Sequence, residues 1–350
     1  MTRKPQSISL VLGSGGARGL AQIGVIRWLE EHSDYRIRSI AGASMGAAVG
    51  GIYAAGRLDA YESWVKTLRR QDVWRLLDFS FRGAGLIRGD RLIEKLRDML
   101  GDTDIEQLPI SFTAVATDIE REREVWLNSG SLFDAIRASI AIPTVFTPVR
   151  HKGRLLVDGG LLNPVPIAPT LNDDTDITLA VSLNGRVGEE LIRPERTRGA
   201  GQGPEKPDSG GLLNHRLTDA RPERTRGAGQ GPEKPDSGGL LNHRLTDALP
   251  DRVGSWLQDW QGKLGLGETD PELSREQEAR ALGLIDIVSH SIEAMQGSIA
   301  RFRIAAYNPE HLIEVPVNAC GVFDFHRAAE MIDLGYQLAE RKLGQRHPPL

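Results

Sequence analysis

The stretch "IAGASMGAAVG" (residues 40–50) determines how the rest of the chain is interpreted. It contains the pattern G-x-S-x-G, with Ser44 at the point where an apolar run ends and a helix of small residues can begin. In this pattern a nucleophilic serine occupies a strained turn between a strand and a helix. Gly42 and Gly46 allow backbone segments to pass closely where a side chain would clash. The same residues are also compatible with a tightly packed helix start that has no chemical role.

Strand-like and helix-like segments alternate on both sides of this stretch. We predict strands at 7–13, 37–43, 110–119, 124–128, 153–160, 176–184 and 311–317, and helices at 17–32, 45–56, 59–70, 90–100, 131–141, 275–306 and 325–343. Short strands alternating with helices are typical of a mainly parallel sheet that is covered on both faces. The expected fold class is therefore α/β with three layers, α/β/α.

The composition of the 350 residues restricts the classes of protein. Hydrophobic residues make up 40% and charged residues 26%, which fits a soluble domain with a real core, and the net charge of −4 gives no reason to expect a nucleic-acid partner. Cys320 is the only cysteine, so an internal disulfide and a cysteine metal cage are both excluded. The apolar run within 1–16 is too weak for a signal peptide, and 40–56 is too short to span a bilayer. We expect a cytoplasmic protein that can touch the inner membrane face without crossing it.

An identical duplication interrupts the second half of the chain. The 28 residues at 193–220 recur without change at 221–248. Two copies rich in glycine, proline and charge do not make a repeat fold, and such a composition cannot offset the entropy of ordering. We therefore expect one domain over 1–350, with its core at about 7–185 and 275–343. A disordered insertion at 186–250 carries the duplication.

A second glycine-rich segment, "LGSGGARGL" (12–20), also lies between a predicted strand and a predicted helix. Its adjacent glycines leave backbone N–H groups free to donate to an oxyanion or a phosphate. It is not a Walker loop, because no Gly-Lys-Ser/Thr follows. Gly13, Gly15 and Gly19 match a loosened dinucleotide spacing, but that interpretation expects an acidic residue at the end of the second strand, where Ser44 stands instead. The sequence therefore favours an oxyanion loop.

The third segment that carries chemistry is "LLVDGGLLNPVPI" (155–167). Asp158 follows an apolar strand and precedes Gly159 and Gly160, so its carboxylate is expected at a strand's end, where sites on such sheets form. An Asp-Gly turn in an ordinary hairpin would look the same in isolation. The segment gains significance only beside the other two.

Taken together and in this order, "GSGGARG", "GASMG" and "DGG" resemble the patatin-like phospholipase family, in particular its bacterial members related to the neuropathy-target-esterase catalytic domain. The resemblance covers about 7–185 and resumes around 275–343. It implies a glycine-rich oxyanion loop after the first strand and a nucleophile elbow after the second. Ser14 stands where the family often has glycine, a departure that matters little if Gly15 and Gly16 supply the donors.

The resemblance also implies how the reaction proceeds. Ser44 attacks an ester carbonyl, and Asp158 accepts its proton directly, as a dyad rather than a triad. The N–H groups of Gly15 and Gly16, with Arg18 nearby, stabilise the oxyanion, and water then hydrolyses the acyl-enzyme. The expected substrates are carboxylic esters of phospholipids or lysophospholipids, and no metal or cofactor is required.

Several alternatives remain open at this point. Ser44, Asp158 and His326 occur in the chain order of an α/β-hydrolase triad, although such enzymes usually place more strands before the elbow. His215 and His243 lie in the duplicated segment and are poor candidates for a base. A catalytically quiet scaffold that keeps the fold is the main rival function, and a nucleotide-binding protein is a more distant one.

Two further expectations concern the surroundings of the site. The apolar neighbours Leu156 and Val157 should raise the pKa of Asp158 by desolvation. The stretch 251–267 spaces tryptophan and aliphatic residues along one helical face, a pattern that fits either a helix docked on the core or a contact with a lipid interface.

Overall fold

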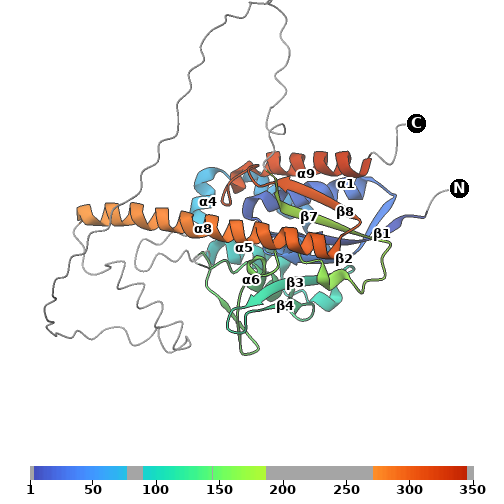
Figure 1. Ribbon diagram of the computed structural model, residues 1–350, viewed down its shortest axis with the longest axis horizontal. Coiled ribbons are helices and arrows are strands. Elements are labelled where there is room, and N and C mark those ends of the chain that lie inside the picture. Colours follow the sequence, from blue (N-terminus) through green and yellow to red (C-terminus); the bar gives the residue numbers. More distant parts are fainter. Residues whose placement is uncertain (1–3, 77–89, 144, 187–270, 345–350) are drawn as a thin grey trace, which may run out of the picture. The chain divides into compact units, whose positions relative to one another are not determined.

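The computed structural model describes residues 4–76, 90–143, 145–186 and 271–344 (Figure 1). The chain divides into two units, one of Met1–Pro194 and Glu276–Leu350 and the other of Glu195–Arg275. Of the second unit only residues 271–275 are described. The predicted insertion beyond residue 186, its duplication and the apolar stretch 251–267 lie outside the described residues.

A single sheet forms the middle of the first unit. Its strands are β1 (Gln6–Leu12), β2 (Tyr35–Ala43), β3 (Ser111–Asp118), β4 (Arg123–Leu127), β5 (Val149–His151), β6 (Arg154–Asp158), β7 (Ile177–Gly185) and β8 (His311–Pro316). The order is β5-β6-β3-β2-β1-β7-β8, and β4 also pairs with β3. The neighbouring strands β3-β2-β1-β7-β8 are parallel to one another, whereas β4, β5 and β6 pair antiparallel. The prediction of a mainly parallel sheet is confirmed.

Helices connect these strands on both sides of the sheet (Figure 1). They are α1 (Ala21–Glu31), α2 (Met45–Ala54), α3 (Leu58–Thr67), α4 (Arg70–Leu76), α5 (Asp90–Leu100), α6 (Leu132–Ser139), α8 (Pro271–Tyr307) and α9 (Ala328–Leu343). Short 3₁₀ turns lie at η1 (Gly16–Leu20), η2 (Ile105–Gln107), η3 (Gly159–Leu161), η4 (Ala168–Thr170) and η5 (Phe325–Arg327). None of the described helices combines the length and the apolar character needed to cross a membrane.

The side chains of β1 show which helices cover which face of the sheet. Successive residues of a strand point to opposite faces. Leu10 and Leu12 belong to the main core together with residues of α1, α2 and α9. Val11, between them, belongs to a second cluster with Ala180 of β7 and Ala300 of α8. Helix α8 therefore covers the face opposite to α1, α2 and α9, which makes the three-layer α/β/α fold.

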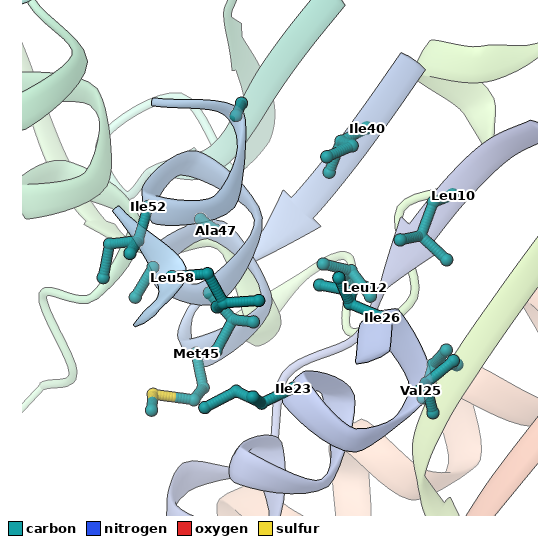
Figure 2. Packing of buried hydrophobic residues seen from close by; sticks show 14 of the residues in the cluster. Leu10, Leu12, Ile23, Val25, Ile26, Ile40, Met45, Ala47, Ile52 and Leu58 are labelled. Carbon is teal, nitrogen blue, oxygen red and sulfur yellow. The ribbon is translucent and has the colours of Figure 1, made fainter. Parts of the chain in front are cut away.

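The main core is built where the first two strands meet the helices that follow them. Figure 2 shows Leu10 and Leu12 of β1 and Ile40 of β2 beside Ile26 of α1 and Met45 of α2. Four of these five side chains are at most 1% exposed, and Met45 is 8% exposed. Truncating one such aliphatic side chain to alanine typically costs about 2–5 kcal/mol. This packing fixes the turn after β1, which holds the glycine-rich loop, and the turn after β2, which holds Ser44.

Strand β3 brings β2 and β6 end to end along one of its edges. Strand β2 pairs with residues 111–115 of β3, and β6 pairs with residues 116–118. Strand β4 pairs with residues 114–118, so its register overlaps both of the others. Because a strand has only two hydrogen-bonding edges, β4 must occupy one edge while β2 and β6 share the other.

This register places the ends of β2 and β6 against each other. Ala43, the last residue of β2, pairs with Val115, and Asp158, the last residue of β6, pairs with Ala116. Ser44 follows Ala43 directly. Two residues far apart in the sequence therefore meet because they end strands on adjacent positions of β3.

The structure differs from the sequence prediction in a few elements. The helix expected at 17–32 is divided into η1 and α1, and the N–H of Ala17 donates to Val322 O (2.8 Å) instead of pointing to solvent. Helix α4 and strand β5 were not predicted. Both are short, with seven and three residues, and so contain too few residues for a periodic pattern to be recognised.

Candidate active site

Ser44 occupies a strained turn between β2 and α2. Its φ of 54° and ψ of −122° lie outside the regions that residues with a side chain favour. A Cβ atom added at Gly46 would lie 2.0 Å from Leu12 O, and one at Gly42 would lie 2.5 Å from the carbonyl of Gly46. Any larger residue at either position would push the turn apart. The glycines of G-x-S-x-G are thus required by close backbone approach.

The surroundings of Ser44 favour a reactive oxygen. The residue is the N-cap of the ten-residue helix α2 and is only 5% exposed. The positive end of the helix dipole stabilises negative charge at this position. The backbone N–H of Ser44 is held by the Ser139 hydroxyl oxygen of α6 at 2.9 Å, a contact that no sequence motif indicates.

Asp158 ends β6 beside this turn and is 3% exposed. Its Oδ1 accepts a hydrogen bond from the N–H of Gly160 at 2.7 Å. Its Oδ2 is buried and makes no hydrogen bond of standard geometry with the described residues. Burial raises the pKa of Asp158 to about 7, although hydrogen bonding from the Ser44 hydroxyl and from the Gly160 N–H partly opposes the rise. The expected effect of desolvation on this carboxyl group is therefore present.

The glycine-rich loop after β1 presents two N–H groups at the same place. Three other N–H groups of the loop donate to backbone carbonyl oxygens: Gly13 to Val181 (3.0 Å), Ser14 to Pro164 (2.8 Å) and Ala17 to Val322 (2.8 Å). Gly15 and Gly16 have no such partner within the described part of the chain, and both line the pocket that also contains Ser44 and Asp158. Gly16 has a φ of 57°, which glycine adopts without strain.

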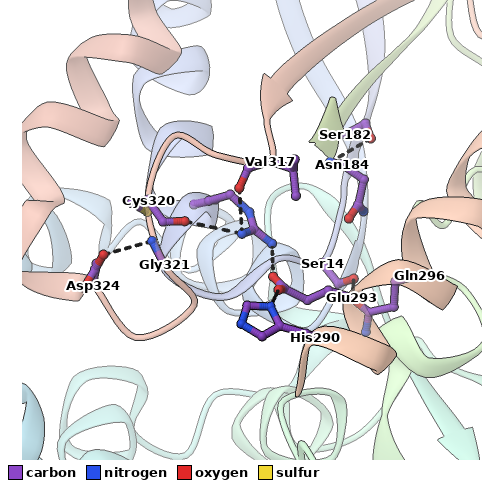
Figure 3. A network of polar contacts seen from close by, with 11 residues as sticks. Ser14, Ser182, Asn184, His290, Glu293, Gln296, Val317, Cys320, Gly321 and Asp324 are labelled. Atoms are coloured by element: carbon purple, nitrogen blue, oxygen red, sulfur yellow. Dashed lines mark hydrogen bonds and ion pairs between the residues drawn. The ribbon is translucent and has the colours of Figure 1, made fainter. Parts of the chain in front are cut away.

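Arg18 lies outside the two pockets at Ser44. One of its guanidinium nitrogens donates to the carbonyl oxygens of Val317 (3.1 Å) and Cys320 (3.4 Å), and the other forms a 2.5 Å ion pair with Glu293 of α8 (Figure 3). His290 lies 3.5 Å from the same carboxylate. The buried guanidinium therefore ties the glycine loop to α8 and to the loop before α9.

Two pockets meet at Ser44. They share five lining residues: Gly16, Ser44, Ile142, Val322 and Phe323. The first encloses about 790 Å³, part of it open to solvent, and its walls are largely apolar side chains such as Tyr61, Leu68, Leu92, Leu96, Phe146 and Phe325. The second encloses about 590 Å³, again partly open to solvent, and it is lined by Asp158 and by the glycine loop. Ser44 thus lies between an apolar and a more polar space.

Helix α8 supplies part of the second pocket, which the sequence did not indicate. Ile292, Glu293 and Gln296 line it, and Gln296 Oε1 lies 3.5 Å from the hydroxyl of Ser14. The residue that departs from the family's glycine string therefore contacts α8 (Figure 3). These side chains come from the far end of the sequence, so no local pattern relates them to Ser44.

No histidine of the described residues lines either pocket. His326 lies in η5, and its Nδ1 is 4.0 Å from Asp324. His215 and His243 lie outside the described residues. Within the described part of the chain, no group of three or more His, Cys, Asp or Glu side chains is arranged to hold a metal ion.

Comparison with known proteins gives matches to a family, to several relatives and to a solved structure. Residues 10–171 match the patatin-like phospholipase family. Uncharacterized NTE family proteins of Mycobacterium bovis and Mycobacterium tuberculosis are each 42% identical over 341 residues, which is 96% of this chain and 91% of the relative. Lysophospholipase nte1 of Emericella nidulans is 31% identical over 182 residues, 51% of this chain and 12% of that protein. A crystal structure of VipD from Legionella pneumophila aligns with a TM-score of 0.35 and 18% identity, over 54% of this chain and 51% of that chain.

The mycobacterial relatives match almost end to end, and the family match covers the glycine loop, the elbow and the Asp-Gly-Gly turn. The resemblance drawn from the three motifs is confirmed. This chain belongs to the NTE family of patatin-like phospholipases, which are carboxylic ester hydrolases.

Proposed function

We propose that this protein hydrolyses carboxylic esters of phospholipids or lysophospholipids with a Ser44–Asp158 dyad, through an acyl-enzyme. One observation carries the proposal. Asp158 Oδ2 is a buried carboxylate oxygen without a hydrogen bond of standard geometry, and its carboxyl group interacts with the hydroxyl of Ser44. Buried polar atoms are normally paired, so a carboxylate oxygen that has no other partner among the described residues and belongs to a residue lining the pocket of Ser44 supports a role as the acceptor of the Ser44 proton.

Acylation begins with transfer of the Ser44 proton to Asp158 Oδ2 as the Ser44 oxygen attacks the ester carbonyl. A general base works best when its pKa lies near the working pH. An ordinary aspartate is too weak a base for this step, and the rise of the Asp158 pKa to about 7 brings it into the useful range. The protonated Asp158 then gives its proton to the departing alcohol oxygen, which leaves Ser44 acylated.

The negative charge on the carbonyl oxygen requires donors that are already in place. The N–H groups of Gly15 and Gly16 are the candidates, because both line the pocket of Ser44 and neither is used by the described backbone. One such donor is typically worth about 3–4 kcal/mol of transition-state stabilisation. The N-terminal end of α2 adds a favourable potential at Ser44 itself.

Deacylation uses the same groups in the reverse order. A water molecule transfers a proton to Asp158 as its oxygen attacks the acyl carbon. Collapse of the second tetrahedral intermediate breaks the bond to the Ser44 oxygen, which regains the proton from Asp158. The fatty acid leaves, and the dyad returns to its starting state.

The two pockets suit the two parts of a lipid ester. The apolar one, lined by side chains such as Leu68, Leu96 and Phe146, has the apolar character of a site for an acyl chain. The second one, with Glu293 and Gln296 on α8, offers polar groups for the alcohol portion. Because such lipids reside in membranes, we propose that the protein reaches them by peripheral contact from the cytoplasm.

The test compares hydrolysis of a lysophospholipid and of a water-soluble p-nitrophenyl ester. Ser44→Ala and Asp158→Asn should each lower kcat/KM for both substrates by at least about 10³-fold. His326→Ala is the matched control, because a dyad enzyme keeps near wild-type activity when this histidine is removed. Activity that survives Ser44→Ala, or that disappears with His326→Ala, would contradict the dyad.

A further inference from the structure

The hydroxyl of Ser139 joins two backbone groups at the centre of the site. Ser139 is the last residue of α6 and is completely buried. Its Oγ accepts a hydrogen bond from the N–H of Ser44 at 2.9 Å and donates one to Val115 O at 2.6 Å. The residue lies in none of the three motifs, and it lines neither of the pockets at Ser44.

The position of this hydroxyl follows from the end of the β2–β3 ladder. The last pair of the ladder is Ala43 with Val115, and the chain then turns at Ser44 with a positive φ. The turn carries the N–H of Ser44 out of the ladder, beside the carbonyl oxygen of Val115. The Ser139 hydroxyl inserts between these two groups, because it can accept from one and donate to the other.

The same carbonyl also supports the turn that carries Asp158. A Cβ atom added at Gly159 would lie 1.9 Å from Val115 O, so the backbone after Asp158 packs directly on this oxygen. Asp158 itself pairs with the next residue of β3, Ala116. The carbonyl to which Ser139 ties the elbow is therefore the one on which the Asp158 turn rests.

We propose that Ser139 is a positioning residue for ester hydrolysis, whose hydroxyl fixes the distance between the Ser44 oxygen and the Asp158 carboxyl. This rests on the proposed function, in which these two groups exchange a proton. Without the hydroxyl, the N–H of Ser44 and the carbonyl of Val115 are left buried and unpaired, and the strained turn is free to relax. A displacement of about 1 Å at a reacting group can cost about 100-fold in rate. The loss should appear in kcat, because Ser139 does not contact the space where substrate binds.

The test uses two pairs of variants that differ mainly in the hydroxyl. Ser139→Ala is compared with wild type, and Ser139→Thr is compared with Ser139→Val, which has nearly the same shape as threonine. For Ser139→Ala we expect kcat on a soluble ester to fall about 10- to 100-fold with KM within about twofold. Ser139→Thr should exceed Ser139→Val in kcat by about tenfold, even if the added methyl group slows both. Because the second pair carries the same packing strain in both members, it tests the proposal if Ser139→Ala is poorly folded.

Controls separate positioning from general loss of stability. Thr170→Val removes another buried hydroxyl that donates to a backbone carbonyl (Ile167 O, 2.8 Å) but lines neither of the pockets at Ser44, and kcat per folded molecule should not change. Equal kcat values for Ser139→Thr and Ser139→Val, or a Ser139→Ala defect confined to KM, would overturn the positioning role. Full activity of Ser44→Ala would instead remove the proposed function, which keeps the two failures distinguishable.

Discussion

Replacing Asp158 by asparagine should remove activity and should also remove a loss of stability that the wild type undergoes between pH 5 and pH 8. The wild-type carboxyl group is 3% exposed, and burial raises its pKa from 3.8 to about 7. A carboxyl group whose pKa is raised on folding is stabilising only while it is protonated. Its contribution is complete below the unfolded pKa and is lost as the pH rises through the folded pKa.

The size of the effect follows from the two pKa values. Between pH 4 and pH 7 the folded protein holds a proton on Asp158 that the unfolded chain has released, and each pH unit in this window lowers the stability of the wild type by about 1.4 kcal/mol. Between pH 5 and pH 8 the loss amounts to roughly 3 kcal/mol, and it levels off above pH 7. Asparagine does not ionise, so its stability lacks this component. The stability of Asp158→Asn relative to wild type should therefore increase by roughly 3 kcal/mol over the same interval.

Urea unfolding followed by circular dichroism, at pH 5 and at pH 8, gives the two differences in free energy of unfolding. The exposed Asp174→Asn is a matched control for removing one aspartate charge, and its difference from wild type should stay nearly constant. A difference between Asp158→Asn and wild type that is the same at both pH values, with unchanged urea dependence, would refute the reasoning. It would mean that the carboxyl group is ionised at pH 5 and is a poorer base than proposed.

Three further predictions follow from the same structure. The kcat/KM of the wild type should fall as the pH is lowered through about 7, because the protonated Asp158 cannot accept a proton; a rate that stays level down to pH 5 would contradict this. Leu68→Trp narrows the apolar pocket and should lower kcat/KM for long-chain p-nitrophenyl esters at least about tenfold while sparing the acetate ester, whereas the exposed Leu171→Trp should change neither. Arg18→Met leaves Glu293 without the guanidinium and should lower the free energy of unfolding in urea by about 3–5 kcal/mol. Glu293→Gln keeps an oxygen acceptor for Arg18 and should lower it by less. Equal losses would show that the ion pair is not what holds α8 at the glycine loop.

The features that could be predicted from the sequence are those set by local constraints. The turn at Ser44 needs a serine with a glycine two residues before it and another two residues after it. A Cβ atom at Gly42 or Gly46 would clash with backbone atoms, so this requirement is visible in the local sequence. The alternation of strands and helices likewise follows from short-range periodicity, and it was sufficient to predict the three layers. Asp158 could be proposed only from the order of motifs, since its approach to Ser44 depends on the register along β3.

Other parts of the site depend on contacts that no local pattern encodes. Ser139 looks like any serine near the end of a helix until its hydroxyl is found between Ser44 and Val115. The resemblance implies that Arg18 lies near the oxyanion. Its side chain pairs with Glu293, a residue of α8 that lines the second pocket and lies far away in the sequence. A buried guanidinium is stabilised by an ion pair with a carboxylate, and only the tertiary structure shows which carboxylate lies within reach.

Mass-spectrometric mapping of a fluorophosphonate adduct tests the identity of the nucleophile, on which the whole account depends. The reagent should add once to wild-type protein, on the tryptic peptide that contains Ser44, and should not add to Ser44→Ala. Asp158→Asn should react at least about 100-fold more slowly, because the hydroxyl then lacks its proton acceptor. An adduct on a different residue, or labelling of Ser44→Ala at the wild-type rate, would contradict the account.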